Sequence, residues 1–373
     1  MAKPMLMTEF ARYYEKISRR QLGLLTFFRF DETMTTDAVQ IMFDRRKSRL
    51  IISKAKNRGA QATNNSEGTF DRVTVTPPVY KECMNFSIQE KDVADFGTNP
   101  FAVDPDRQVR LLKQVARDVF LLDEKMNGAE VWQASQIFQT GKIPFTTAGY
   151  GEGVPDVDFG CPESNFATLT NTTGTLYWDN ASATPLANLE SHCRTIRQNG
   201  HSPVRDIIFG RSAWSCFAAN ASVQNEYNIR RIDTGFIRPE DSREGLAFMG
   251  TIHLDGYYVN LWRSDDVYVS PADNSTVLDY VDPKKVVFIA DGVYEKWYAG
   301  IDTIRGLKDS NFDMMLSQYM RADGNITIVG DRMATSLYVD TYDDHGIVML
   351  RAQKAPLCIV KSNDTFGCLK VLG

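Results

Sequence analysis

The most regular pattern along the chain is a run of apolar residues spaced three and four positions apart, which is the spacing of one helix face. The run comprises Leu112, Val115, Val119, Leu122, Met126 and Ala129. Asp104 can cap this helix, Pro105 suits its first turn, and Gly141 can end it. The pattern predicts one helix over about residues 105–139, which at 1.5 Å per residue is about 50 Å long. Helices of ordinary globular domains are much shorter, so we expect a spine that spans an extended, flat molecule.

Ahead of this helix, the pattern is typical of β-strands. Residues 47–55 and 70–84 predict two strands, Pro77 and Pro78 interrupt the second, and residues 57–68 predict a polar, turn-rich tip. Together they predict one extended β-hairpin. Such a hairpin has too little apolar surface to be stable alone in water. We therefore expect it to lie on another subunit, and an ordinary hairpin packed on its own chain is the alternative.

The residues before the hairpin predict an arm. Phe10, Tyr13 and Ile17 have helical spacing, and the apolar stretch LGLLTFFRF follows them. We expect this arm, residues 1–46, to reach neighbouring subunits.

The chain after the long helix predicts short strands and then a mixed α/β unit. Residues 142–170 are rich in glycine and proline and show no helical period. Thr184 and Pro185 open a helix that Gly200 ends, and residues 225–244 form a polar loop. The other expected elements are a helix at 212–223 and strands at 206–209, 253–262 and 285–290. Three apolar runs near the end predict strands that pair with earlier segments: 347–350, 357–360 and 369–372.

Length and composition fit a globular protein with one large or two ordinary domains. The chain has 373 residues, of which 43% are hydrophobic and 24% are charged. It contains no apolar run long enough for a membrane helix, and its start lacks the apolar core of a secretory signal. We therefore expect no membrane contact, and a location in a cytoplasm. The six cysteines form no C-x-x-C pair, so we expect buried free thiols rather than a zinc site or disulfides.

The net charge of −5 argues against a protein whose main task is to hold nucleic acid. Charge is nevertheless unevenly distributed, and three groups are candidates for contacts. Seven cations at 45–58 are expected to meet acids of a neighbouring subunit: Arg45, Arg46, Lys47, Arg49, Lys54, Lys56 and Arg58. The polar loop has mixed charge suited to pairing with its own copy around a symmetry axis: Arg230, Arg231, Arg238, Glu240, Asp241, Arg243 and Glu244. In each case the alternative is a solvated surface, or for the basic segment direct binding of nucleic acid.

The third group lies near the start of the long helix. Arg110, Lys113 and Arg117 share one helix face there, although cations are slightly unfavourable near a helix N-terminus. Ion pairs between subunits are the interpretation that the residues alone suggest.

The motifs of common enzymes are missing from the sequence. Gly141-Lys142 lacks the upstream glycine of a Walker loop, and neither a nucleophile elbow nor H-E-x-x-H occurs. Asp340, Asp343, Asp344 and His345 could bind a cation, but a polar hairpin turn is the simpler interpretation. We expect no catalytic residue, no cofactor and no metal.

Several short segments occur, in order, where one known family has them. They are Phe27-Phe28-Arg29 with Thr35-Thr36 and Val39, Val157-Asp158-x-Gly160 with Glu163 and Asn165, Trp178 ahead of the helix LANLESHC, Arg230-Arg231, and Ala355-Pro356-Leu357. In these features the chain resembles the phage major capsid protein E family, to which the lambda shell protein belongs.

The resemblance implies an α+β fold of the Hong Kong 97 type, with an N-terminal arm, an extended loop, a peripheral domain carrying the spine helix, and an α/β axial domain. The corresponding segments here are 1–46, 47–86, 87–180 with 327–373, and 181–326. It also implies a virion protein assembled in the host cytoplasm into hexamers and pentamers of an icosahedral shell. Scaffolding, portal and decoration proteins are the implied partners, with packaged DNA held only loosely. The long helix would border the inner surface of the shell, so scaffold or packaged DNA are possible contacts of Arg110, Lys113 and Arg117, besides ion pairs between subunits. An enzyme and a tail or adhesin component are the alternatives to a shell protein, and the long helix and the arm argue against a tail component. We expect no covalent bond between subunits, because the sequence offers no recognisable cross-linking site.

Overall fold

The computed structural model describes most of the chain, with gaps. The described residues are 23–36, 38–45, 71–87, 107–146, 150–151, 153–172, 176–230, 245–273, 275–300, 326–330, 333–342 and 347–373. The helices are η1 (Gly23–Phe27), η2 (Glu32–Met34), α2 (Arg107–Thr140), η4 (Glu163–Asn165), α3 (Pro185–Gly200), α4 (Arg211–Ala219) and α5 (Ala221–Arg230).

The first strands are β1 (Ile41–Arg45), β2 (Asp71–Val75), β3 (Tyr80–Ser87), β4 (Lys142–Ile143), β5 (Val157–Asp158), β6 (Phe166–Thr168), β7 (Val204–Phe209), β8 (Ala247–Leu254) and β9 (Tyr257–Arg263). The later strands are β10 (Val267–Val269), β11 (Val277–Asp279), β12 (Lys285–Ala290), β13 (Tyr294–Tyr298), β14 (Ile326–Gly330), β15 (Met333–Tyr342), β16 (Ile347–Lys354), β17 (Pro356–Val360) and β18 (Phe366–Lys370). Helices and sheets therefore both contribute, as in an α+β fold.

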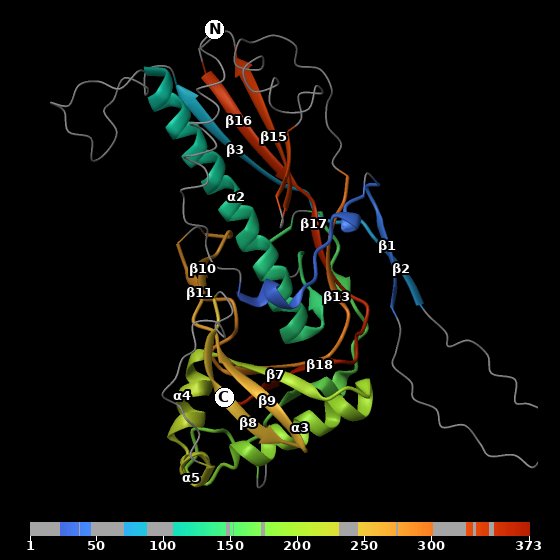
Figure 1. Ribbon diagram of the computed structural model, residues 1–373, viewed down its shortest axis with the longest axis vertical. Helices are drawn as coiled ribbons and strands as arrows, with labels where there is room; N and C mark the ends of the chain where they lie inside the picture. The colour runs from blue at the N-terminus through green and yellow to red at the C-terminus, as the bar shows by residue number, and fades with distance from the viewer. Residues whose placement is uncertain are drawn as a thin grey trace, which may run out of the picture.

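The helix α2 is 34 residues long and runs obliquely between two sheets (Figure 1). It ends where Gly141 takes a φ of +72°, a left-handed conformation that favours glycine. The N–H of Gly141 donates to the carbonyl oxygen of Ile137 at 2.7 Å. The expected caps Asp104 and Pro105 lie outside the described residues. Within the helix, a Cβ at Gly128 would lie 3.1 Å from the Tyr280 hydroxyl oxygen, so a larger residue would require this tyrosine to shift.

The sheet at one end of α2 has the strand order β14-β15-β16-β3. The strand β3 pairs with β16 along its whole length, from Ser87 opposite Ile347 to Tyr80 opposite Lys354. Pro77 and Pro78 separate β3 from β2, which pairs with β1 instead. The predicted break at the two prolines is confirmed, and it divides the second strand of the hairpin between two sheets. The predicted first strand, 47–55, and the tip, 57–68, lie outside the described residues.

The pair β1–β2 is anchored to the body of its own chain. Ile41 and Phe43 are buried in the main core, whereas Met42 between them is 67% exposed. Figure 1 shows this pair projecting at one side of the molecule.

The part of the arm that the structure describes also packs on its own chain. Leu24, Leu25 and Phe28 lie in the main core together with residues of α2. The N–H of Arg29 donates to Tyr294, and the N–H of Thr36 to Tyr298, each at 2.9 Å. The apolar side chains of these residues are thus buried within the chain, and contact of the arm with neighbouring subunits stays a prediction. Residues 1–22 lie outside the described part.

The sheet at the other end of α2 has the order β6-β18-β12-β7-β9-β8. Alternate residues of β7 face opposite sides: Ile207 and Phe209 pack with α3 and α4, whereas Ile208 packs in the core that contains the end of α2. Both faces of this sheet are thus covered by helices (Figure 1).

Two predicted elements are each divided in the structure. The segment 253–262 is not one strand: Asp255 and Gly256, with φ of +48° and +85°, form the turn between β8 and β9. The predicted helix 212–223 is two helices, because Asn220 has an extended backbone and its Oδ1 accepts the N–H of Ser222 at 3.0 Å.

The predicted end of the helix α3 is displaced by one residue. Gly200 is still helical and His201 is the left-handed residue. Gly200 is needed for space, because a Cβ there would lie 2.7 Å from the carbonyl oxygen of Asp364.

The prediction that the last strands pair with earlier segments is confirmed. Strand β16 pairs with β3, β17 with β13, and β18 with both β12 and β6. Within the described part of the chain, no helix has the length and apolar content needed to cross a bilayer.

Candidate functional site

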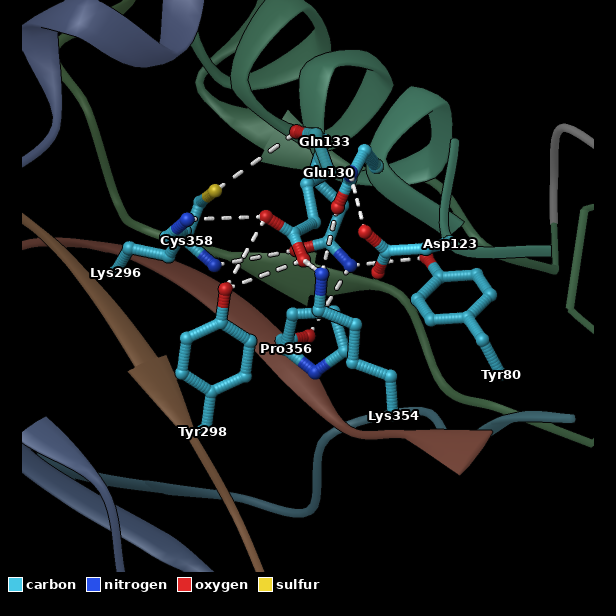
Figure 2. Close-up of polar contacts among 10 residues, drawn as sticks. Tyr80, Asp123, Glu130, Gln133, Lys296, Tyr298, Lys354, Pro356 and Cys358 are labelled. Carbon is cyan, nitrogen blue, oxygen red and sulfur yellow. Dashed lines mark hydrogen bonds and ion pairs between the residues drawn. The ribbon is translucent and has the colours of Figure 1, made fainter. Parts of the chain in front are cut away.

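The most unusual group in the structure is a buried carboxylate on α2, Glu130, which is 1% exposed. Two lysines face it from different strands. Lys296 of β13 places its Nζ 3.1 Å from one carboxylate oxygen, and Lys354 of β16 forms an ion pair with the other. Figure 2 shows both amines pointing at the carboxylate. Buried charges are rare unless they are paired, so this cluster fixes how the two strands lie against the helix.

Hydrogen bonds extend the cluster. The Tyr298 hydroxyl donates to Glu130 at 3.3 Å, and Lys354 Nζ donates to the Oδ1 of Asn127 at 2.7 Å. The Nδ2 of Asn127 in turn donates to Asp123 at 3.4 Å. An amine, a carboxamide and two carboxylates are therefore in contact with one another.

One turn further along α2, Gln133 connects the helix to two more strands. Its Nε2 donates to the Tyr80 hydroxyl at 2.9 Å and to the carbonyl oxygen of Pro356 at 3.2 Å. Its Oε1 accepts the N–H of Cys358 at 3.1 Å. Tyr80 begins β3, and Cys358 lies on β17. Neighbouring turns of α2 therefore contact β13 and β16 through Glu130, and β3 and β17 through Gln133 (Figure 2).

Electrostatics determine the charge states in this cluster. Burial alone would raise the pKa of Glu130, but Lys296 and Lys354 outweigh it and hold the pKa below its ordinary value. Burial lowers the pKa of Lys354 even though a carboxylate faces it. Burial also raises the pKa of the Tyr298 hydroxyl, which therefore stays protonated as a donor. The described residues contain no group of three metal-ligating side chains.

A groove beside α2 presents aromatic side chains. It has a volume of about 710 Å³, and it lies between the helix and the β10–β11 pair. Trp132 and Tyr150 have ring centroids 4.7 Å apart, and the hydroxyl oxygens of Tyr150 and Tyr268 are 3.3 Å apart. Leu121 and Val269, at its rim, are 46% and 53% exposed. Exposed apolar side chains beside a groove are typical of contact surfaces.

Of the seven predicted cations near the hairpin, the structure describes Arg45. Its guanidinium forms an ion pair with Asp71 on β2 and packs against Gly160, so its charge is met within the chain. Arg72 and Asp44 form a second ion pair across the same two strands, at 2.8 Å. The remaining six lie outside the described residues: Arg46, Lys47, Arg49, Lys54, Lys56 and Arg58.

The other predicted contact residues are placed only in part. Arg230 is the last residue of α5, and Arg110, Lys113 and Arg117 all lie on α2. Of these four, the structure describes the side chain of Arg117, which is exposed. Arg231, Arg238, Glu240, Asp241, Arg243 and Glu244 lie outside the described residues, as do Asp343, Asp344 and His345.

Sequence reasoning missed the Glu130 cluster. Glu130 lies four residues after Met126 and belongs to the same buried helix face, so a charge within an apolar stripe was the available signal. No local spacing connects it to Lys296 or Lys354, which come from distant strands.

These features define a class of protein. A long spine helix between two sheets, the projecting strand pair β1–β2 and a helix-covered mixed sheet are the features of the Hong Kong 97-type fold of phage capsid subunits. The chain belongs to the phage major capsid protein E family, whose sequence model matches residues 7–327.

Several solved structures are similar to the chain, and the first of those that follow agrees with it in fold. A protein assigned as the capsid protein of a prophage of Escherichia coli CFT073 has a TM-score of 0.62 at 15% identity, covering 100% of this chain and 99% of that one. A phage-related protein from Bordetella bronchiseptica RB50 has a TM-score of 0.46 at 9% identity, with 97% and 95% covered. A chain of Gordonia phage Cozz has a TM-score of 0.44 at 12% identity, with 96% and 89% covered. No curated protein matches the sequence.

Proposed function

We propose that this chain is the major capsid protein of a tailed bacteriophage, which assembles into hexamers and pentamers of an icosahedral shell around double-stranded DNA. The observation that carries the proposal is the family match over residues 7–327, together with a spine helix and a projecting hairpin base. Thin, extended elements let one chain contact several copies of itself under closed symmetry. The proposed location is the virion, with assembly in the host cytoplasm.

The hairpin is the proposed main contact within a capsomer. On its described base, the apolar side chains of Val39, Met42 and Val79 are 46%, 67% and 39% exposed. In the sequence, six cations follow β1, from Arg46 to Arg58. Exposed apolar side chains, followed in the sequence by cations, suit a partner surface with an apolar centre and an acidic rim. The mixed-charge loop, Arg230 to Glu244, is the proposed contact around the symmetry axis.

The proposed subdomains follow the predicted ranges, with two changes that strand pairing supports. Residues 1–46 are the arm, 47–86 the extended loop, 87–180 with 327–373 the peripheral domain, and 181–326 the axial domain. Strand β13 pairs with β17, so it belongs with the peripheral part. Strand β18 pairs with β12, so it belongs with the axial sheet.

We propose a structural role rather than turnover of an external substrate, because the family is one of shell proteins. Scaffolding, portal and decoration proteins are the proposed partners. Arg110, Lys113 and Arg117 are proposed to face the shell interior, where a net charge of −5 per chain would hold DNA only loosely. A tail component is the alternative function.

The deciding experiment is expression of the full chain, alone and together with its neighbouring phage genes, followed by sedimentation and electron microscopy. We expect closed shells or rings of five and six subunits. Tubes or elongated trimers would support the tail component instead, and a small fixed oligomer would exclude both. If a decoration protein exists, shells of this chain alone should break at a lower temperature than virions.

A further inference from the structure

The side chains around Lys354 form an arrangement with a chemical consequence of its own. Lys354 is 0% exposed, and its amine donates to the carboxamide oxygen of Asn127 at 2.7 Å. The same amine touches Glu130, and the amide nitrogen of Asn127 lies 3.4 Å from Asp123. An amine in contact with a carboxamide, with one carboxylate beside each nitrogen, resembles a reactant complex held in place.

We propose that Lys354 Nζ and Asn127 Cγ form an amide bond within the chain, releasing ammonia. The bond would join α2 to the end of β16. It goes beyond the shell function and does not depend on it.

The nucleophile is prepared by burial. A free amine attacks carbonyl carbon, whereas an ammonium does not, and a desolvated lysine loses its proton more readily. Burial lowers the pKa of Lys354. Glu130 is held ionised by Lys296, and its carboxylate contacts the Lys354 amine, so it can accept the proton. Figure 2 shows Lys354 and Glu130 directed at each other.

The step is balanced without any added reagent. The Lys354 ammonium gives one proton to Glu130, and the amine then attacks Cγ of Asn127. As the new C–N bond forms and the old one breaks, the second amine proton and the proton on Glu130 go to the departing nitrogen. Ammonium leaves, Glu130 is ionised again, and nothing is oxidised or reduced. Asp123, next to the Asn127 nitrogen, stabilises the positive charge that develops there.

The product keeps the carboxylate of Glu130 paired. Glu130 contacts two buried lysines, and the side chain of Lys296 is 5% exposed. An amide at Lys354 removes one positive charge, and the pair of Glu130 with Lys296 remains. Because both residues lie in one chain, contacts between subunits stay non-covalent.

The test is mass spectrometry of the full chain as it is purified, after denaturation. We expect a mass lower than that of the unmodified polypeptide by one ammonia, and a protease digest should yield a branched peptide joining Asn127 to Lys354. A linear digest with intact Asn127 and Lys354 would overturn the proposal without any variant.

A different reaction could release the same mass. Asn127 and Asn199 each precede glycine, and such sites can lose ammonia to form a cyclic imide with the backbone. Lys354→Arg separates the two, because a cyclic imide would persist in this variant while the proposed bond would not form. A deficit that survives Lys354→Arg therefore overturns the proposal.

Two further variants test the role of the carboxylate. Glu130→Gln keeps the size of the side chain and removes the proton acceptor, so we expect a chain without the mass deficit. Lys361→Arg is the matched control, since Lys361 pairs with Glu295 away from Asn127 and its variant should keep the bond. If Glu130→Gln forms the bond as fast as the unaltered chain, Glu130 is not the acceptor and this mechanism is wrong.

Discussion

Glu130 illustrates how one side chain can hold distant segments together. Its carboxylate meets lysines from β13 and β16 and a tyrosine from β13, all buried with it. Burying an ion pair costs desolvation free energy, so such a pair contributes little net stability compared with an apolar packing. Removing one partner is a different matter, because the remaining charges stay buried without compensation.

Glu130→Ala should therefore lower the free energy of unfolding by about 3–5 kcal/mol, since it leaves Lys296 and Lys354 facing each other. The measurement is denaturant unfolding of the unassembled chain. Glu190→Ala is the matched control: Glu190 pairs with Arg194 on the surface of α3, and its loss should cost less than about 1 kcal/mol. If both substitutions lowered the free energy of unfolding equally, the two lysines would not be destabilised by the loss of the Glu130 carboxylate.

His192 should make stability depend on pH. It is 6% exposed on α3, its Nε2 lies 3.1 Å from the Asn165 carbonyl oxygen, and burial lowers its pKa from 6.5 to about 4. As pH falls below 6.5, the unfolded chain gains a proton that the folded chain cannot take up, so stability falls until about pH 4. Above pH 6.5 this contribution is fully present.

The expected loss between pH 7 and pH 5 is about 2 kcal/mol of unfolding free energy from this one group. His192→Gln should remove that part of the pH dependence, as measured by denaturant midpoints at the two pH values. His253→Gln, at an exposed site on β8, should leave it unchanged. If both variants keep the full dependence of unfolding free energy on pH, His192 does not cause that dependence.

At the scale of elements, the most accurate predictions from sequence are the helices and strand ends that neighbouring residues specify. The helix α2 and its end at Gly141 follow from apolar spacing and one glycine. The strand break at Pro77 and Pro78 follows from the missing backbone donors of proline. The division between β8 and β9 was missed although Asp255-Gly256 is a common hairpin turn, because the apolar run on either side reads as one strand.

The hairpin base offers a matched pair of substitutions in one strand. Phe43 is 5% exposed, with its ring 6.1 Å from that of Phe159, so Phe43→Ala should lower the unfolding free energy by about 3–5 kcal/mol. Met42→Glu, at the exposed neighbouring position, should change it by no more than about 0.5 kcal/mol but should reduce the yield of shells. Unfolding of the unassembled chain and electron microscopy of the assembly reaction measure the two effects. Normal shell assembly by Met42→Glu would exclude this face as a subunit contact.

At the scale of the whole molecule, the sequence showed the parts of the fold but not how they join. The Glu130 cluster brings together residues from α2, β13 and β16, and no local pattern encodes those contacts. The same limit applied to the arm. The spacing in its apolar stretch does not specify what this stretch packs against, and Leu24, Leu25 and Phe28 lie in the core of their own chain.

The position of a charge along the chain should affect assembly more than the net charge does. Subunits with a net charge of −5 repel one another, and the basic segment beyond β1 supplies local attraction. Lys54→Glu should therefore lower the fraction of chain that enters shells, as followed by light scattering at several salt concentrations. Lys81→Glu makes the same change in net charge at an exposed site on β3 and should have a smaller effect. If both substitutions lowered the fraction of chain in shells equally, net charge alone would explain the effect.

The position of β18 in its sheet has a consequence for biosynthesis. This strand lies between β6 and β12, yet it is made after both. Until residues 366–370 leave the ribosome, β6 has no neighbour and β12 has an open edge, so the surrounding core stays incomplete. Such long-range pairing makes folding slow, and it delays a mature subunit until almost all of this sequence has been translated. Fragments released early during translation would then be unable to join a growing particle and would be left to host proteases.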